Sequence, residues 1–168
     1  MMFRTMRREK QLLTTKECVQ ILTRGTSGVL AVSGDDDYPY GVPLSYVYHD
    51  HKIYFHSAKS GHKLDAIARN PKASFCVIDQ DQIVPQEYTS YFRSVIAFGT
   101  ARVLEDDAEK KRALELLAVR YSPDQEQERL QQEVAKSLGS VAMIELTIEH
   151  LSGKEAKELA KKKRFSSQ

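Results

Sequence analysis

The chain has few of the residues that mark secreted, membrane-spanning or zinc-binding proteins. It contains only two cysteines, Cys18 and Cys76, and neither has another Cys or His nearby at metal-ligand spacing. This pattern predicts reduced, buried thiols and no metal site, with a disulfide as the disfavoured alternative. No stretch approaches the roughly 20 apolar residues of a membrane helix, and no apolar segment follows the basic residues 1–10 as it would in a secretory signal. We therefore expect a cytoplasmic protein with no membrane partner.

The chain also lacks a strong net charge. Lys and Arg number 25 against 23 Asp and Glu, and the resulting charge of +2 is too small to indicate a nucleic-acid partner. With 41% hydrophobic and 29% charged residues, the 168-residue chain has the composition of one globular domain. We assign residues 1–160 to that single domain and the basic residues 161–168 to a flexible tail.

Local signals predict four helices. Thr14 and Glu17 have the spacing of a capping box, and Asn70-Pro71 is a typical helix stop. Gly25 and Gly139 are expected to end the first and last helices. The predicted helices begin at about Thr14, Gly61, Asp106 and Ser122.

Six strands are predicted from runs of β-branched and aromatic residues. Residues 41–48 and 53–56 flank a tight turn and form a hairpin. The run 88–104 is too long for one straight strand, so we expect a bend or bulge near Gly99. Antiparallel strands joined by short hairpins, with helices outside them, favour an α+β barrel over a doubly wound parallel sheet. The predicted strands cover residues 27–33, 41–48, 53–56, 72–78, 88–104 and 141–148.

The segment 56–63 is the first candidate for a binding site. It leads from a strand into a helix N-terminus, where backbone N–H groups are unpaired and the helix dipole is positive. Most helices place Asp or Glu there, but this one places Lys59, His62 and Lys63, each of which should disfavour the helix by about 0.3–1 kcal/mol. A bound dianionic phosphate would reverse the sign of these interactions. The same segment offers hydroxyl donors at Ser57 and Ser60, and Gly61 lets the backbone come close to a ligand because it has no side chain. The alternative is that the lysines are solvated, and no nucleotide-binding motif supports the site independently.

A second candidate lies on the strand that contains Tyr91, Arg93 and Ser94. An arginine in an otherwise apolar strand is unfavourable unless it meets an anion. That anion could be a ligand phosphate, or it could be an Asp or Glu at an edge or interface. His56 has two interpretations as well, because it could lie beside a cofactor or be a hydrogen-bonded structural residue.

The order of these motifs resembles a known family. Residues 40–46 (Tyr-Gly-Val-Pro-Leu-Ser-Tyr), 53–58 (Ile-Tyr-Phe-His-Ser-Ala) and 61–63 (Gly-His-Lys) resemble the FMN-binding core of the pyridoxamine-phosphate-oxidase-like split barrels. The most similar branch is the nitroimidazole-reductase (Nim) group, to which residues 91–99 and 151–155 are also similar. The resemblance extends from about residue 10 to residue 159, and its order and spacing are more specific than any single motif.

The resemblance implies a six-stranded antiparallel split β-barrel flanked by helices, a homodimer, and FMN at the dimer interface. The strand residues expected along the flavin ring are Pro43, Leu44, Ser45 and Tyr46. The residues expected around the ring edge, ribityl chain and phosphate are His56, Ser57, Ala58, Lys59, Gly61, His62 and Lys63. Those expected to complete the site, from the same chain or from the partner subunit, are Tyr91, Arg93 and Ser94.

The function that this resemblance implies is an FMN-dependent oxidoreductase. NAD(P)H would supply electrons, and a small electrophile such as a 5-nitroimidazole would accept them. The alternatives are a haem-binding split barrel, a non-catalytic protein that binds a flavin or another phosphorylated ligand, and a plain interaction module. No residue of the sequence is identified as a catalytic acid or base.

Overall fold

The computed structural model describes residues 3–166. Its helices are α1 (Thr15–Arg24), α2 (His62–Arg69), α3 (Asp107–Tyr121), α4 (Gln127–Leu138) and α5 (Lys157–Ser166), and its short 3-10 helices are η1 (Glu9–Gln11), η2 (Asp35–Asp37) and η3 (Pro85–Glu87). The strands are β1 (Ser27–Ser33), β2 (Pro39–Ser45), β3 (Val47–His49), β4 (Lys52–Ser57), β5 (Lys72–Val84), β6 (Thr89–Val103) and β7 (Ala142–Glu155). None of the described helices is long and apolar enough to cross a membrane.

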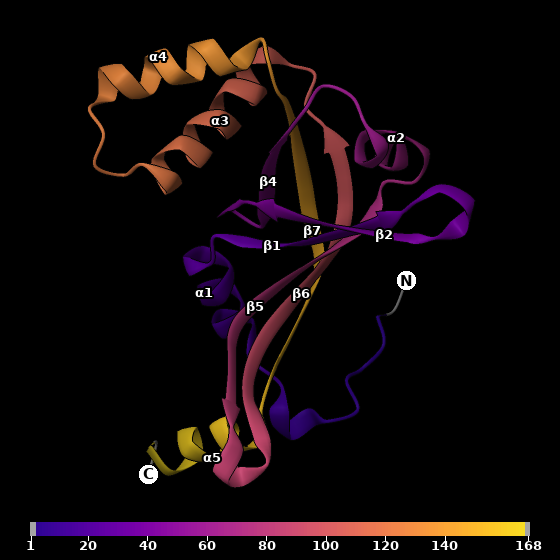
Figure 1. Ribbon diagram of the computed structural model, residues 1–168, viewed down its shortest axis with the longest axis vertical. Coiled ribbons are helices and arrows are strands. Elements are labelled where there is room, and N and C mark those ends of the chain that lie inside the picture. The colour runs from indigo at the N-terminus through magenta and orange to yellow at the C-terminus, as the bar shows by residue number, and fades with distance from the viewer. Residues whose placement is uncertain (1–2, 167–168) are drawn as a thin grey trace.

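All seven strands belong to one antiparallel sheet with the order β2-β1-β5-β6-β7-β4-β3. β2 and β3 are the two outer strands of this sheet, yet only Tyr46 separates them along the chain. The sheet therefore curls until its two edges approach each other, as a split barrel does (Figure 1). The predicted α+β split barrel is confirmed, with seven strands instead of six because the predicted strand 41–48 is divided at Tyr46.

The break at Tyr46 follows from the burial of its side chain. Tyr46 is fully buried, and its hydroxyl donates to the carbonyl of Leu22 in α1 at 2.7 Å. Its backbone N–H donates to the carbonyl of Thr26 at 3.3 Å and to the Tyr121 hydroxyl at 3.1 Å. These bonds replace the ladder bonds that a continuous strand would make at this residue.

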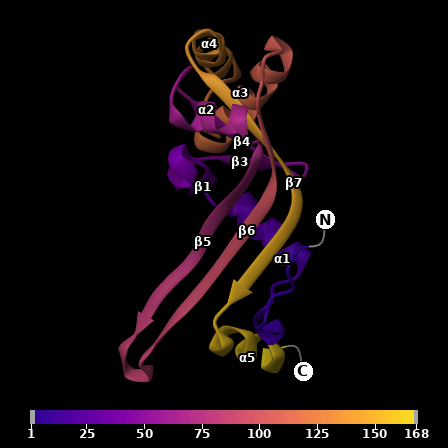
Figure 2. The same ribbon diagram turned by 90° about the vertical axis from the view of Figure 1, so that its right-hand side faces the viewer.

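The strands β5 and β6 are longer than the barrel and extend from it as a two-stranded arm, which Figure 2 shows from the side. The bulge predicted near Gly99 is confirmed, because the β6–β7 register shifts between Phe98 and Gly99. A Cβ atom at Gly99 would overlap the carbonyl oxygen of Thr147, so β6 and β7 approach here more closely than side chains allow.

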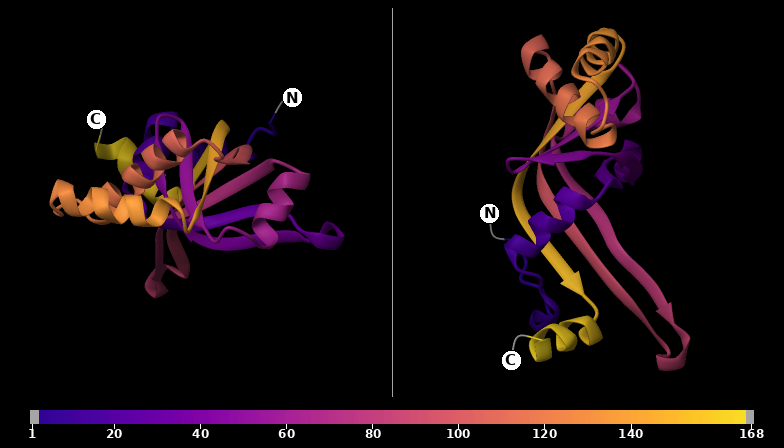
Figure 3. Two further views of the ribbon diagram at one scale, coloured as in Figure 1. Left: turned by 90° about the horizontal axis from the view of Figure 1, so that it is seen from above. Right: turned by 90° about the vertical axis from the view of Figure 1, so that its left-hand side faces the viewer.

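The helices cover the barrel at its ends. α3 and α4 pack side by side at one end of the molecule, and α5 lies at the other end beside η1, apart from the tip of the arm (Figures 1 and 3). The predicted capping box is confirmed at α1, where Thr14 accepts from the N–H of Glu17 and Glu17 accepts from the N–H of Thr14. The main hydrophobic core lies inside the barrel and includes the edge-to-face rings of Tyr46, Phe55 and Phe75.

Two predictions about helices need correction. The fourth helix starts at Gln127 and not near Ser122, because the carbonyl of Ser122 accepts from Gln125 in a turn while its N–H ends α3. The stretch from Lys157 to Ser166, predicted as a fraying end with a flexible tail, forms α5. Lys163 anchors this helix through Glu155 at 2.6 Å and through Glu17, while residues 167–168 of the predicted tail lie outside the described part of the chain.

Candidate functional site

The segment from β4 into α2 runs beside strand β2. At one end of β2, the ring of Tyr40 stacks on His62, with ring centroids 4.1 Å apart. At the other end, Ser45 and His56 line the same cavity. The two contacts are five residues apart on β2, which corresponds to roughly 17 Å of extended chain. The structure thus places two predicted parts of the site, β2 and residues 56–63, side by side along one strip, in which Tyr40 and Ser45 belong to opposite faces of β2.

The loop between β4 and α2 is open and has no side-chain cap. Residues 58–61 are exposed, and Gly61 has φ +137°, a conformation that side chains strongly disfavour. Gly61 is also the N-cap residue of α2, and it provides no side-chain hydrogen bond to the first turn. Polar N–H groups at the start of α2 therefore face an exposed loop that a ligand can approach.

Two lysines flank this helix start without carboxylate partners. Neither Lys59 nor Lys63 forms an ion pair with another described residue. Asp65 is the acidic residue of the first turn. Asp65 offsets part of the positive charge, but the two lysines leave this helix start net positive, which favours an anion at this position.

Ser57 adds an unusual feature to the same segment. Its side chain is only 5% exposed, and among the described residues its Oγ is the buried side-chain polar atom with no hydrogen-bond partner. A buried hydroxyl without a partner is unfavourable by about 1–3 kcal/mol. Such a group, placed at the end of β4 directly before the open loop, fits a segment that makes further polar contacts when a ligand is bound.

His62 has a positioning role within the chain. Its Nε2 accepts from the backbone N–H of Asp35 at 3.3 Å and lies 3.6 Å from the carboxylate of the same residue. Arg69 at the other end of α2 binds that carboxylate at 2.7 Å, and this hydrogen bond lowers the pKa of Asp35. Asp35 and Tyr40 thus fix α2 against the β1–β2 connection. Sequence reasoning missed both residues, because their partners lie more than twenty positions away in the sequence.

The predicted contacts along β2 divide between its two faces. Pro43 and Ser45 are exposed, whereas Leu44 packs against the core and Tyr46 is fully buried. The backbone N–H and the hydroxyl of Tyr46 are engaged within the chain, and its carbonyl lies 3.3 Å from the Tyr121 hydroxyl. The prediction that Tyr46 lies along a cofactor is therefore wrong for its side chain, because alternation along a strand gives only every second residue to each face.

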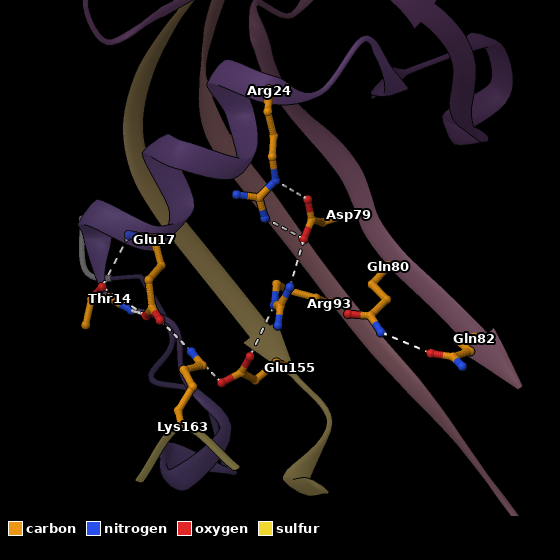
Figure 4. A network of polar contacts seen from close by, with 9 residues as sticks. All are labelled: Thr14, Glu17, Arg24, Asp79, Gln80, Gln82, Arg93, Glu155 and Lys163. Atoms are coloured by element: carbon orange, nitrogen blue, oxygen red, sulfur yellow. Dashed lines mark hydrogen bonds and ion pairs between the residues drawn. The ribbon is translucent and has the colours of Figure 1, made fainter. Parts of the chain in front are cut away.

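Tyr91, Arg93 and Ser94 do not join this strip within one chain. Arg93 pairs with Glu155 at the end of β7, whereas His56 pairs with Met143 at its beginning, which separates them by roughly 40 Å of strand. Arg93 binds the carboxylates of Asp79 and Glu155, each at 3.2 Å (Figure 4). Arg93 therefore meets protein carboxylates, one of the two kinds of anion considered for it. A contact of these residues with a cofactor held by the partner subunit stays a prediction.

The titratable side chains in the described part of the chain do not form a metal site. No group of three or more His, Cys, Asp or Glu side chains that could hold a metal ion occurs among the described residues. Cys18 is buried and Cys76 is partly buried, and burial raises the pKa of both thiols, to about 11 for Cys18. The predicted burial is thus confirmed for Cys18, whereas Cys76 is only partly buried.

The architecture defines a split-barrel protein, and comparison with known proteins gives its family. The chain belongs to the pyridoxamine 5'-phosphate oxidase family, whose sequence model matches residues 14–155. The superfamily inferred from the motifs is therefore confirmed. No curated protein matches the chain in sequence.

Several solved structures share the fold. A Bacteroides thetaiotaomicron protein, whose name provisionally assigns it to 5-nitroimidazole antibiotic resistance, is 20% identical over 86% of both chains, with a TM-score of 0.72. An FAD-binding protein from Mesorhizobium loti is 26% identical over 87% of this chain and 97% of its own, with a TM-score of 0.61. An FAD- and haem-binding protein from Mycobacterium smegmatis is 21% identical over 88% of this chain and 74% of its own, with a TM-score of 0.70.

Proposed function

We propose that this chain is an FMN-binding flavoprotein that reduces a small electrophile such as a 5-nitroimidazole, with NAD(P)H as the electron donor. The observation that carries the proposal is the helix start of α2, where Lys59 and Lys63 have no ion-pair partner among the described residues and Gly61 leaves the first turn uncapped. An anion is the ligand that this arrangement favours most.

Different residues of the strip would contact different parts of the cofactor. Lys59, Lys63 and the first N–H groups of α2 would hold the phosphate, and the exposed face of β2 at Pro43 and Ser45 would support the ring. His56 would lie at the ring edge, because it shares a cavity with Ser45. A flavin bound there would supply reversible two-electron transfer.

A homodimer completes this proposal. The arm formed by β5 and β6 exposes apolar side chains, with Ile78 at 67%, Ile83 at 70% and Tyr88 at 98% exposure. A second copy would cover such surface, and the same contact could bring the partner's arm, with its Tyr91, Arg93 and Ser94, toward the strip. Sedimentation should show a dimer, and a stable monomer that binds FMN would contradict this part of the proposal.

The phosphate contact is tested by comparing FMN with riboflavin, which lacks the phosphate. The double variant Lys59→Ala/Lys63→Ala should weaken FMN binding by about a hundredfold, given about 1.5 kcal/mol for each charge-assisted contact, and should leave riboflavin binding unchanged. The control variant Lys16→Ala/Lys111→Ala removes two exposed lysines elsewhere on the surface and should bind both ligands normally. Equal FMN affinity in wild type and the first variant would refute the phosphate site.

The reaction is tested by anaerobic reduction of the purified protein with NAD(P)H and subsequent mixing with a 5-nitroimidazole. Reoxidation faster than in buffer alone is the expected result, and its absence would remove the nitroreductase part of the proposal. The absorption spectrum of the purified protein distinguishes the haem alternative, which His56 keeps open as an exposed imidazole lining a cavity. A Soret band without flavin absorption would favour haem.

A further inference from the structure

A cavity of about 290 Å³, open to solvent, lies between the α3–α4 pair and the barrel. The barrel contributes Ser45 and His56 to the lining, α3 contributes Ala118 and Tyr121, and α4 contributes Glu133 and Ser137. A volume of roughly 300 Å³ is at the lower end of ligand pockets and suits a compound of one or two rings. It is too small to enclose a dinucleotide.

Most of the lining is apolar, and its polar groups are few. The hydroxyl of Tyr121 donates to the carbonyl of Thr26 and accepts from the N–H of Tyr46, so it is already engaged. The His56 side chain is exposed, and its imidazole makes no side-chain hydrogen bond or ion pair with a described residue. The barrel side of the cavity therefore offers an imidazole that a ligand can reach.

The charged group of the lining is Glu133, and no Lys or Arg lines this cavity. Glu133 forms no ion pair with a described residue, although Arg129, one turn earlier on α4, lines a neighbouring cavity with it. A single carboxylate beside an apolar slot repels anions and attracts ligands that carry a positive charge or an N–H donor.

We infer that this cavity binds a small, flat, largely apolar ring compound that is neutral or positively charged, and that Glu133 discriminates against carboxylates. One part of this inference rests on the proposed function, namely that such a compound is the electron acceptor. Ser45 and His56 line the barrel side of the cavity and also belong to the proposed flavin strip, so a compound held between α3 and α4 would lie beside a flavin ring on β2.

Three probes of the same shape test this inference: benzamidine, benzamide and benzoate, which carry positive, zero and negative charge. Titration of each into the purified full-length protein, followed by NMR or calorimetry, should give benzamidine at least about tenfold tighter than benzoate. Glu133→Gln should reduce that ratio to less than about threefold and leave benzamide unchanged. The matched control, Glu128→Gln, alters an exposed glutamate of the same helix that does not line the cavity and should keep the wild-type order.

A second variant tests the location of the site. Ala118→Phe or Ser137→Phe should fill the cavity and weaken all three probes, with thermal melting showing that each variant is folded. Dissociation constants above about 10 mM for every probe, or a charge preference that survives Glu133→Gln, would overturn the inference. FMN affinity measured on the same samples separates the two proposals. Normal FMN binding without discrimination among the probes refutes only the cavity inference. Discrimination among the probes without FMN binding refutes only the flavin site.

Discussion

At the scale of single residues, Gly99 has the least room for a side chain. A Cβ there would overlap the backbone of Thr147 on the paired strand, and the backbone cannot rotate away as a flexible side chain could. We expect Gly99→Ala to lower the free energy of unfolding by about 1–3 kcal/mol, measured by urea denaturation. Gly139→Ala is the matched control, because nothing lies within 4 Å of its Cβ position and its φ of −83° suits alanine. Equal effects of the two substitutions would contradict the steric explanation.

Tyr46 provides a second test, which separates a core role from a cofactor role. Tyr46→Phe removes the hydroxyl that donates to the buried carbonyl of Leu22, so we expect a loss of about 1–3 kcal/mol in the free energy of unfolding. FMN affinity should not change in the folded variant. Tyr38→Phe, at a side chain that is 75% exposed, should have no effect on stability. A loss of FMN binding without a loss of stability would restore the original prediction for Tyr46.

The sequence predicted the charges at the start of α2 better than the orientation of the side chains along β2. The helix start with Lys59 and Lys63 was predicted from charges adjacent in sequence, which a local pattern can reveal. The orientation along β2 depends on which strand face meets the core, and a resemblance that names a whole run does not distinguish the two faces. The partners of Arg93 could not be predicted, because Asp79 and Glu155 approach it only through the pairing of β5, β6 and β7.

At the scale of elements, local sequence signals predicted a helix start or end correctly where the capping residue belongs to a single helix. Thr14 begins α1 and Gly139 ends α4 as predicted. Ser122 failed as a helix start because its N–H already closes the last turn of α3, so the residue serves the preceding helix. A helix end and a helix start that compete for the same residue cannot be ranked from the sequence alone.

The helix α5 gives the prediction at this scale. Lys163 joins it to α1 through Glu17 and to the end of β7 through Glu155, which is only 2% exposed. Lys163→Ala should increase amide hydrogen exchange in α5 and lower the free energy of unfolding by about 1 kcal/mol, since the lysine is partly solvated and Arg93 still pairs with Glu155. Lys161→Ala, an exposed lysine of the same helix, should leave both measurements unchanged. Identical exchange in the two variants would exclude Lys163 as the anchor.

At the scale of the whole molecule, a few ionised carboxylates join segments that are distant in the sequence. Asp79 on β5 binds Arg24 of α1 at 2.6 Å and Arg93 of β6 at 3.2 Å (Figure 4). Burial alone would raise the pKa of Asp79, but the hydrogen bonds from both arginines outweigh it and lower the pKa below its ordinary value. The pKa of Glu145 on β7 is lowered in the same way, because hydrogen bonds from Arg102 and Lys52 together outweigh its burial.

These lowered pKa values set the direction of the pH dependence. A carboxyl group whose pKa is lower in the folded state contributes stability above its unfolded pKa, near 4, and loses that contribution as the pH falls through the folded value. The free energy of unfolding should therefore be nearly constant from pH 7 to about pH 5 and should decrease toward about pH 3. Urea denaturation across this range measures it.

Asp79→Asn should be less stable than wild type at pH 7, and the difference should shrink toward pH 3, where the wild-type carboxylate also becomes neutral. A difference in stability that stays constant with pH would contradict this explanation. It would mean that Asp79 contributes by packing and hydrogen-bond geometry, and that its negative charge does not hold Arg24 of α1 and Arg93 of β6 in place.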